Sequence, residues 1–205
     1  MKKNKIKNKT LISKQKQNLF LQLEALYNHM ESTYNDIANK IGLTCDSCEN
    51  NCCTSYFQHH THIEWAYLYK GLKSLSDTKQ EEIFMRAKEY VKLSEKKLLK
   101  NEPIKIMCPL NEKGKCILYK YRLMICRLHG IPNVVKMPNG VMKKFSGCYR
   151  CVQITKDKPY FPIMDRTPFY IKLAELERKF KRLLEKPLKK VDHTLAEMIV
   201  LGEPR

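Results

Sequence analysis

A chain of 205 residues is long enough for one domain with a hydrophobic core, and no apolar run in it reaches the length of a membrane span. The formal net charge of +18 would attract nucleic acid, anionic surfaces or acidic partners. No apolar segment or small-residue cleavage site follows the basic N-terminus, which argues against a signal peptide. We therefore expect a cytoplasmic protein with reduced thiols and no membrane partner.

Lysines dominate the start of the chain, because residues 1–16 contain seven of them and no acidic residue. This composition predicts a disordered basic arm in front of a single domain formed by residues 17–205. The simpler interpretation of the arm is a solubilising tail, and an arm that binds nucleic acid is the alternative.

Two helix starts can be placed in the first third of the domain. Apolar residues at three- and four-residue spacing predict a helix from about Asn18 to Lys40, and Gly42 marks its end. Thr61 and Glu64 have the spacing of a capping box, which predicts that a second helix begins there.

A third helix is indicated by similar spacing at Asp77 and Gln80, followed by an apolar stripe. Asn101 and Pro103 predict its end. Beyond it, residues 103–165 are rich in Gly, Pro and Asn and show little periodicity, which is typical of a loop-rich region organised around a metal.

One short β-hairpin and two last helices complete the expected elements. Asn139 and Gly140 form a hairpin-turn dipeptide between short strand-like flanks. Thr167 begins a helix with Pro168 at its first position, and residues 191–201 predict a short final helix. The expected fold class is mainly α, with helices surrounding a loop-rich cysteine metal core.

The cysteines fall into three groups along the sequence. They are Cys45, Cys48, Cys52 and Cys53, then Cys108, Cys116 and Cys126, then Cys148 and Cys151. In a reducing compartment such clusters favour metal binding or redox chemistry over disulfides, and thiolates select zinc, copper(I) or iron–sulfur clusters. All nine are candidate metal ligands.

Cysteine spacing alone leaves the metal open. Two C-x2-C units, Cys45/Cys48 and Cys148/Cys151, would make a four-cysteine zinc site, but about a hundred residues separate them, far more than in a local zinc ribbon. The iron–sulfur interpretation does not match the ferredoxin spacings. The basic segment 108–151 would offset the charge of about −2 that either centre carries.

The ordered cysteines resemble the YkgJ-type cysteine-cluster family, whose members are described as zinc- or iron-chelating proteins. The family pattern runs from a C-x2-C-x2-C-C cluster through C-P-(F/L)-L and G-x-C-x-I-Y to R-P-x-x-C-R. In this chain it falls on Cys45, Cys48, Cys52, Cys53, Cys108, Pro109, Leu110, Gly114, Cys116, Tyr119, Arg122, Cys126 and Arg127.

Two departures from the family pattern are visible. Three residues separate Cys48 from Cys52, a gap that resembles the flagellin lysine methylase relatives, which look like iron–sulfur proteins, and Leu123 stands where proline is usual. The resemblance therefore implies metal binding, whereas no methyl-donor motif is recognisable in the chain.

Four histidines and one glutamate near the cysteines can have simpler roles than metal binding. His59, His60, His62 and His129 lie near cysteines in the sequence but are more simply explained as loop residues than as ligands. Glu64 is explained equally by helix capping and by a hydrogen bond to a metal ligand.

Arg122 and Arg127 flank Cys126 and are candidate cofactor-binding residues, because guanidinium groups can donate to sulfur or hold an anion. Ordinary surface arginines are the alternative.

The sequence thus predicts a metal-binding protein with a cysteine-ligated centre. A [4Fe-4S] cluster ranks first, with zinc or mononuclear iron as alternatives. Cys148 and Cys151 either complete that centre or form a second one.

A redox or protein-modifying activity on a protein substrate, similar to that of a lysine methylase, is one expectation. A structural zinc module that binds nucleic acid or a protein partner through its basic surface, and a metal-handling protein without catalysis, are the others; nucleic acid is not the favoured partner.

Overall fold

The computed structural model describes residues 2–45, 48, 52–184 and 189–204. These residues form a mainly helical fold, as the sequence predicts. The helices are α1 (Lys2–Ile41), α2 (His62–Leu72), α3 (Asp77–Leu99), α4 (Met124–Leu128), α5 (Tyr149–Thr155), α6 (Thr167–Arg182) and α7 (Leu195–Leu201), with the short 3-10 turns η1 (Cys52–Thr54) and η2 (Tyr119–Tyr121). No helix in this part of the chain is both long enough and apolar enough to cross a membrane.

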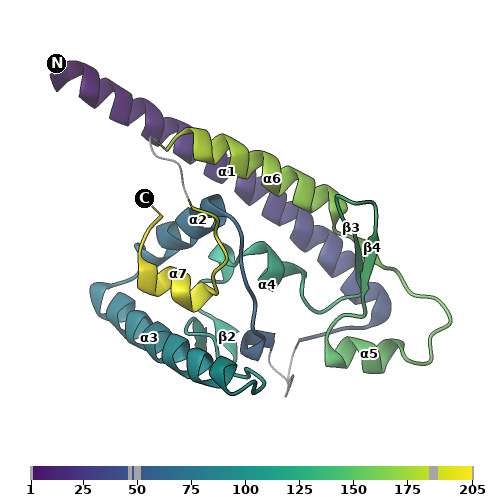
Figure 1. The fold of residues 1–205 in the computed structure, drawn as a ribbon. Helices are drawn as coiled ribbons and strands as arrows, with labels where there is room; N and C mark the ends of the chain where they lie inside the picture. Colours follow the sequence, from purple (N-terminus) through teal and green to yellow (C-terminus); the bar gives the residue numbers. More distant parts are fainter. Residues whose placement is uncertain (1, 46–47, 49–51, 185–188, 205) are drawn as a thin grey trace.

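The long helix α1 and α6 lie side by side, and α2 packs against α6 on the inner side of this pair (Figure 1). The apolar stripe predicted for the first helix is buried here: Leu23 and Met30 of α1 are fully buried and share a core with Leu176 and Phe180 of α6. This core forms one half of the molecule.

A second core lies between α2, α3 and α7. Leu68 of α2, Ile83 of α3 and Met198 of α7 are completely buried there. Because neighbouring residues on α2 face different cores, with Tyr67 in the first and Leu68 in the second, α2 joins the two halves. Cys108 and Cys116 pack against the second core, and Cys148 packs against the first.

The N-terminal segment differs from its expected state. Residues 2–16 were predicted to be a disordered arm, but they form the first part of α1, which begins at Lys2. Lysine is a good helix former, and no Gly or Pro interrupts the sequence before Gly42, so the helix continues toward the N-terminus. This part of α1 extends beyond the other helices (Figure 1).

Helix α2 begins where predicted but is not capped as predicted. Thr61 is the N-cap residue, yet its hydroxyl donates to Glu64 Oε2 at 2.7 Å instead of accepting from the helix N–H groups. The carboxylate of Glu177 on α6 accepts the Ile63 N–H at 3.0 Å and bonds His62 Nδ1 at 2.7 Å. A side chain from another helix therefore caps α2.

Two other helix starts are shifted. The N-cap of α3 is Ser76, one residue before the expected Asp77, and its hydroxyl accepts the Lys79 N–H. Helix α7 begins at Leu195 rather than near residue 191, because Thr194 and Glu197 form a complete capping box there.

The β-structure is small. The predicted hairpin is present as antiparallel β3 (Asn133–Lys136) and β4 (Met142–Phe145), whose turn contains Gly140 with a positive φ of 84°. A strand that the sequence did not predict, β5 (Met164–Asp165), pairs parallel with β3. A second hairpin joins β1 (Asn111–Glu112) and β2 (Lys115–Cys116).

Candidate metal centre

Four of the cysteines form what we call the inner thiol group. It consists of Cys53, Cys108, Cys116 and Cys126, which come from η1, the segment after α3, β2 and α4. The Cys108 N–H donates to the Cys53 carbonyl at 2.9 Å, which joins two segments that are far apart in sequence. Burial raises the pKa of Cys108, Cys116 and Cys126, and a thiolate at Cys53 raises each of them further. The four sulfur atoms are therefore close enough to interact electrostatically.

The position of Cys126 is set by a buried carboxylate. Glu64 Oε1 on α2 accepts the N–H of Met124, the first residue of α4, at 2.7 Å. The same oxygen accepts the Tyr27 hydroxyl at 2.7 Å, so Glu64 ties α1, α2 and α4 together. Burial raises the pKa of Glu64, and the hydrogen bonds it accepts oppose that rise. Glu64 is thus neither a helix cap nor a direct sulfur contact; it anchors the helix that carries Cys126.

Arg122 lies among the thiols, as its sequence position beside Cys126 suggested. Burial raises the pKa of Cys45, Cys116 and Cys126, and the positive charge of Arg122 opposes that rise. The same charge adds to the lowering of the Cys53 pKa. The Arg122 guanidinium carbon stands 3.5 Å from the centre of the Tyr119 ring. Its Nε is buried and has no hydrogen-bond partner among the described residues. A buried donor without a partner is costly unless an acceptor is supplied, and sulfur is the acceptor at hand.

Arg127 is arranged differently. Its guanidinium donates to the main-chain carbonyls of Arg122, at 2.8 Å from Nε, and of Lys120. It also stacks on the Tyr27 ring, with its central carbon 4.1 Å from the ring centre. Arg127 therefore holds the turn between η2 and α4 in shape, and through that turn it orients Arg122.

The adjacent cysteines have unequal thiols. Cys52 donates a hydrogen bond to Cys53, which lowers the pKa of Cys53 to about 6 and raises that of Cys52. The Asn111 side chain also lowers the pKa of Cys53 by hydrogen bonding, and its Nδ2 is buried without another partner in the described part of the chain. Cys53 is consequently the inner thiol most readily ionised.

Four of the five remaining cysteines form the outer thiol group: Cys45, Cys48, Cys148 and Cys151. Cys45 is exposed at the end of the loop after α1 and receives a hydrogen bond from the Tyr34 hydroxyl. Cys148 is the N-cap residue of α5, and Cys151 in its first turn is completely buried. Cys52 lies between the two groups: its hydrogen bond to Cys53 and burial raise its pKa most, and charges at Cys126 and at Cys45 raise it further.

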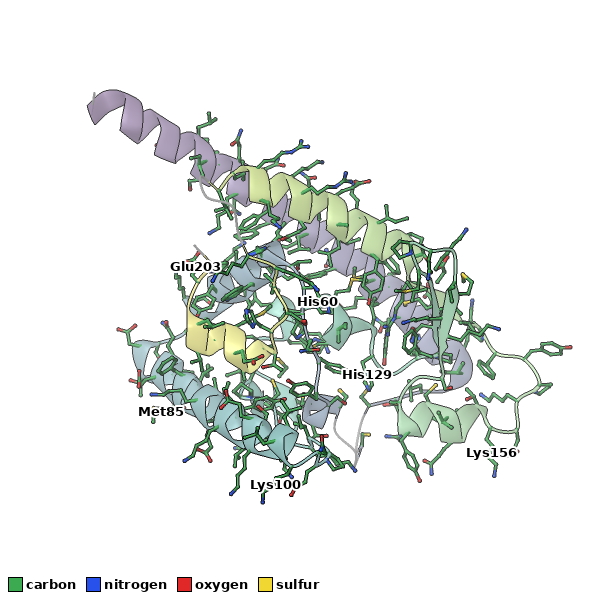
Figure 2. All side chains as sticks on the ribbon, in the orientation of Figure 1. His60, Met85, Lys100, His129, Lys156 and Glu203 are labelled. Atoms are coloured by element: carbon green, nitrogen blue, oxygen red, sulfur yellow. The ribbon has the colours of Figure 1, made fainter. Side chains whose placement is uncertain are left out.

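The histidines near the cysteines have other partners. His62 bonds Glu177 at 2.7 Å, and the main chain of His59 pairs with that of His193. Burial lowers the pKa of His59 to about 3. His129, labelled with His60 near the middle of the molecule in Figure 2, packs on the Phe57 ring at 5.1 Å.

These residues fit a sulfur-ligated metal by their chemistry. Within the described ranges, no three His, Cys, Asp or Glu side chains are already grouped as the ligands of one ion. The inner thiol group nevertheless offers four soft ligands, and two buried donors, Arg122 Nε and Asn111 Nδ2, stand beside them without other partners. Such donors stabilise sulfur ligands and tune the centre they hold.

No family model, curated protein or solved structure matches this chain. The resemblance to the YkgJ-type family therefore remains a prediction from the cysteine pattern.

Sequence reasoning missed several residues of this region. Tyr34 lies within the helix predicted for residues 18–40 and was not a candidate site residue, but its hydroxyl reaches Cys45. Asn111 stands in the N-E-K-G turn, where its Oδ1 accepts the Gly114 N–H at 3.1 Å. That turn signal could have placed Asn111 beside Cys116, to which it is paired across β1 and β2.

Proposed function

We propose that this protein binds a cysteine-ligated metal centre, an iron–sulfur cluster, in the inner thiol group. The observation that carries the proposal is that four thiols from four different segments influence one another. The charge of Arg122 acts on three of them, Cys53, Cys116 and Cys126. Burial and the neighbouring thiols raise the pKa of Cys108, Cys116 and Cys126, so ionising them without a nearby cation costs free energy. A metal centre removes that cost, because it replaces their protons.

The surroundings of the inner thiol group suit a centre with net negative charge. A four-thiolate cluster or zinc site carries about −2 overall. Arg122 provides a positive charge, and its Nε and Asn111 Nδ2 provide hydrogen bonds to sulfur. Glu64 is held away from the sulfurs by the three hydrogen bonds it accepts, so that its oxygens face α4, Tyr27 and Thr61.

The order of the cysteines favours iron–sulfur over zinc, because it resembles that of the flagellin lysine methylase relatives. A bound cluster would supply one-electron redox chemistry. The chain's own residues would hold it at the junction of the two helical cores, with Cys52 exposed on one side. A redox or protein-modifying activity on a protein substrate would take place at this exposed side.

Metal and sulfide analysis tests the proposal. The full chain is purified without oxygen, and iron, zinc and acid-labile sulfide are measured together with the visible spectrum. We expect a brown protein with iron and sulfide in similar amounts, and loss of both in Cys116→Ser and Cys126→Ser. A colourless protein that takes up only zinc, even after reconstitution with iron and sulfide, would overturn the iron–sulfur proposal. Far-UV circular dichroism of each variant separates loss of ligand from loss of fold.

A further inference from the structure

The outer thiol group brings together two C-x2-C units that are about a hundred residues apart in sequence. Cys45 and Cys48 follow α1, and the Cys48 N–H donates to the Cys45 carbonyl at 3.3 Å, which holds these two cysteines together. Cys148 and Cys151 begin α5. The separation of the two units in sequence is too wide for a local zinc ribbon, but the fold brings them together.

The turn at Gly130 is where the two units meet. The Gly130 carbonyl accepts the Cys148 N–H at 3.0 Å. The Tyr34 hydroxyl, which bonds the Cys45 thiol, lies so close to Gly130 that a Cβ on this residue would collide with it. Cys148 bonds Gly130 directly, and Cys45 reaches it through Tyr34. Burial raises the pKa of Cys45 and a thiolate at Cys148 raises it further, so the two cysteines are neighbours.

A second glycine brings Cys151 to the same place. Gly147 has a φ of +90°, and a Cβ on it would stand 2.5 Å from the Gly130 carbonyl oxygen and 2.9 Å from Cys151 Sγ. The buried sulfur of Cys151 thus points back toward the Gly130 turn. Only glycine permits this close approach with that backbone conformation.

The end of α1 and the end of α5 are also joined directly. The Lys158 ammonium, just after α5, donates to the carbonyl of Ile41, the last residue of α1, at 2.7 Å. In Figure 1 the C-terminal end of α1 lies next to α5. The loop that carries Cys45 and Cys48 therefore starts beside the helix that carries Cys148 and Cys151.

We infer that Cys45, Cys48, Cys148 and Cys151 form a second metal site, a four-thiolate zinc site separate from the inner thiol group. Two C-x2-C units are the ligand set of structural tetrahedral zinc sites, which take four protein ligands and leave no open position. Zinc here would fasten the loop after α1 to α5. This inference does not depend on which metal the inner thiol group binds.

Zinc content of matched variants tests the inference. The full chain is prepared as wild type, as Cys148→Ser/Cys151→Ser and as Cys108→Ser/Cys116→Ser, and zinc and iron are measured in each. We expect the outer double variant to lose one equivalent of zinc and to keep its iron, and the inner double variant to keep that zinc. Unchanged zinc content in the outer double variant would overturn the inference. Loss of iron from the outer double variant would also overturn it, because Cys148 and Cys151 would then ligate the inner centre. A chain that binds zinc through the outer group and no iron would instead contradict the proposed function alone.

A measurement on the wild-type chain covers the case in which the outer variant does not fold. The zinc-loaded and chelator-treated chains are alkylated with iodoacetamide, and each cysteine is quantified by mass spectrometry. We expect zinc to slow alkylation of Cys45 and Cys48, the more accessible unit, at least tenfold. Equal rates with and without zinc would overturn the inference.

Discussion

At the scale of single residues, the two arginines beside Cys126 have separate tasks. The sequence predicts both as candidate cofactor-binding residues. In the structure Arg122 faces the thiols with a buried Nε that has no partner in the described chain, whereas Arg127 is bonded to main-chain carbonyls. Arg122 follows η2 and Arg127 lies within α4, and no pattern in the sequence indicates which way either side chain turns.

Replacing Arg122 should therefore change the properties of the centre more than the fold. In Arg122→Gln we expect a lower reduction potential, because a positive charge beside the sulfurs favours the more negative reduced state. Redox titration followed by visible absorbance measures this, and Arg122→Lys should lie between the two. Arg178→Gln, at an exposed position of α6, is the control and should leave the potential unchanged. An unchanged potential in Arg122→Gln would contradict the assigned role.

At the scale of elements, Glu64 joins three helices at the inner thiol group. Removing its carboxylate leaves the Tyr27 hydroxyl and the Met124 N–H buried without an acceptor. We expect Glu64→Ala to lower the free energy of unfolding by about 3 kcal/mol and to reduce the metal content. Glu64→Gln keeps an acceptor for both donors and should stay within about 1 kcal/mol of the wild type with full metal content. Urea unfolding and metal analysis measure the two effects, and equal metal content in both variants would show that Glu64 does not position Cys126.

Glu177 links α6 to the start of α2, and its effect should depend on pH. Burial alone would raise its pKa, but the hydrogen bonds from His62 and the Ile63 N–H outweigh burial and lower it. The lowered pKa means that the ionised carboxylate stabilises the fold above its unfolded pKa of about 4.3, and that this stabilisation is lost as the pH falls through the folded pKa.

We expect Glu177→Gln to lower the free energy of unfolding by about 1 kcal/mol at neutral pH. The difference in free energy of unfolding from the wild type should shrink between about pH 5 and pH 3. Urea unfolding across that range measures it. Glu175→Gln, which removes only a surface pair with Lys172 on the same helix, should change stability by less than about 0.5 kcal/mol at every pH. A difference for Glu177→Gln that grows toward low pH would contradict this account.

At the scale of the whole molecule, the first turns of α1 extend beyond the packed helices (Figure 1), and the buried core begins at Leu19. Deleting residues 2–10 should therefore change the free energy of unfolding by less than about 0.5 kcal/mol and leave the metal content unchanged. The deletion removes five lysines, so any salt-dependent binding to a DNA oligonucleotide should weaken. Urea unfolding, metal analysis and a binding titration at two salt concentrations measure these effects. A loss of stability above about 1 kcal/mol would show that this segment packs on the rest of the chain.

The whole fold also shows what a single sequence can predict. The apolar stripe of α1, the Pro168 start of α6 and the Asn139–Gly140 hairpin are encoded by nearby residues, and these predictions are confirmed. The cap of α2 by Glu177, from 114 positions away, and the pairing of β5 with β3 depend on tertiary contacts that no local pattern reveals. For the candidate centre, the sequence supplied all nine cysteines as candidates, but their division into an inner and an outer thiol group comes from the fold.

X-ray absorption at the iron edge of the full chain, purified without oxygen, shows whether thiolates ligate a metal in this protein. We expect a first shell of sulfur atoms alone, together with an iron–iron distance. A first shell of nitrogen and oxygen atoms would contradict it.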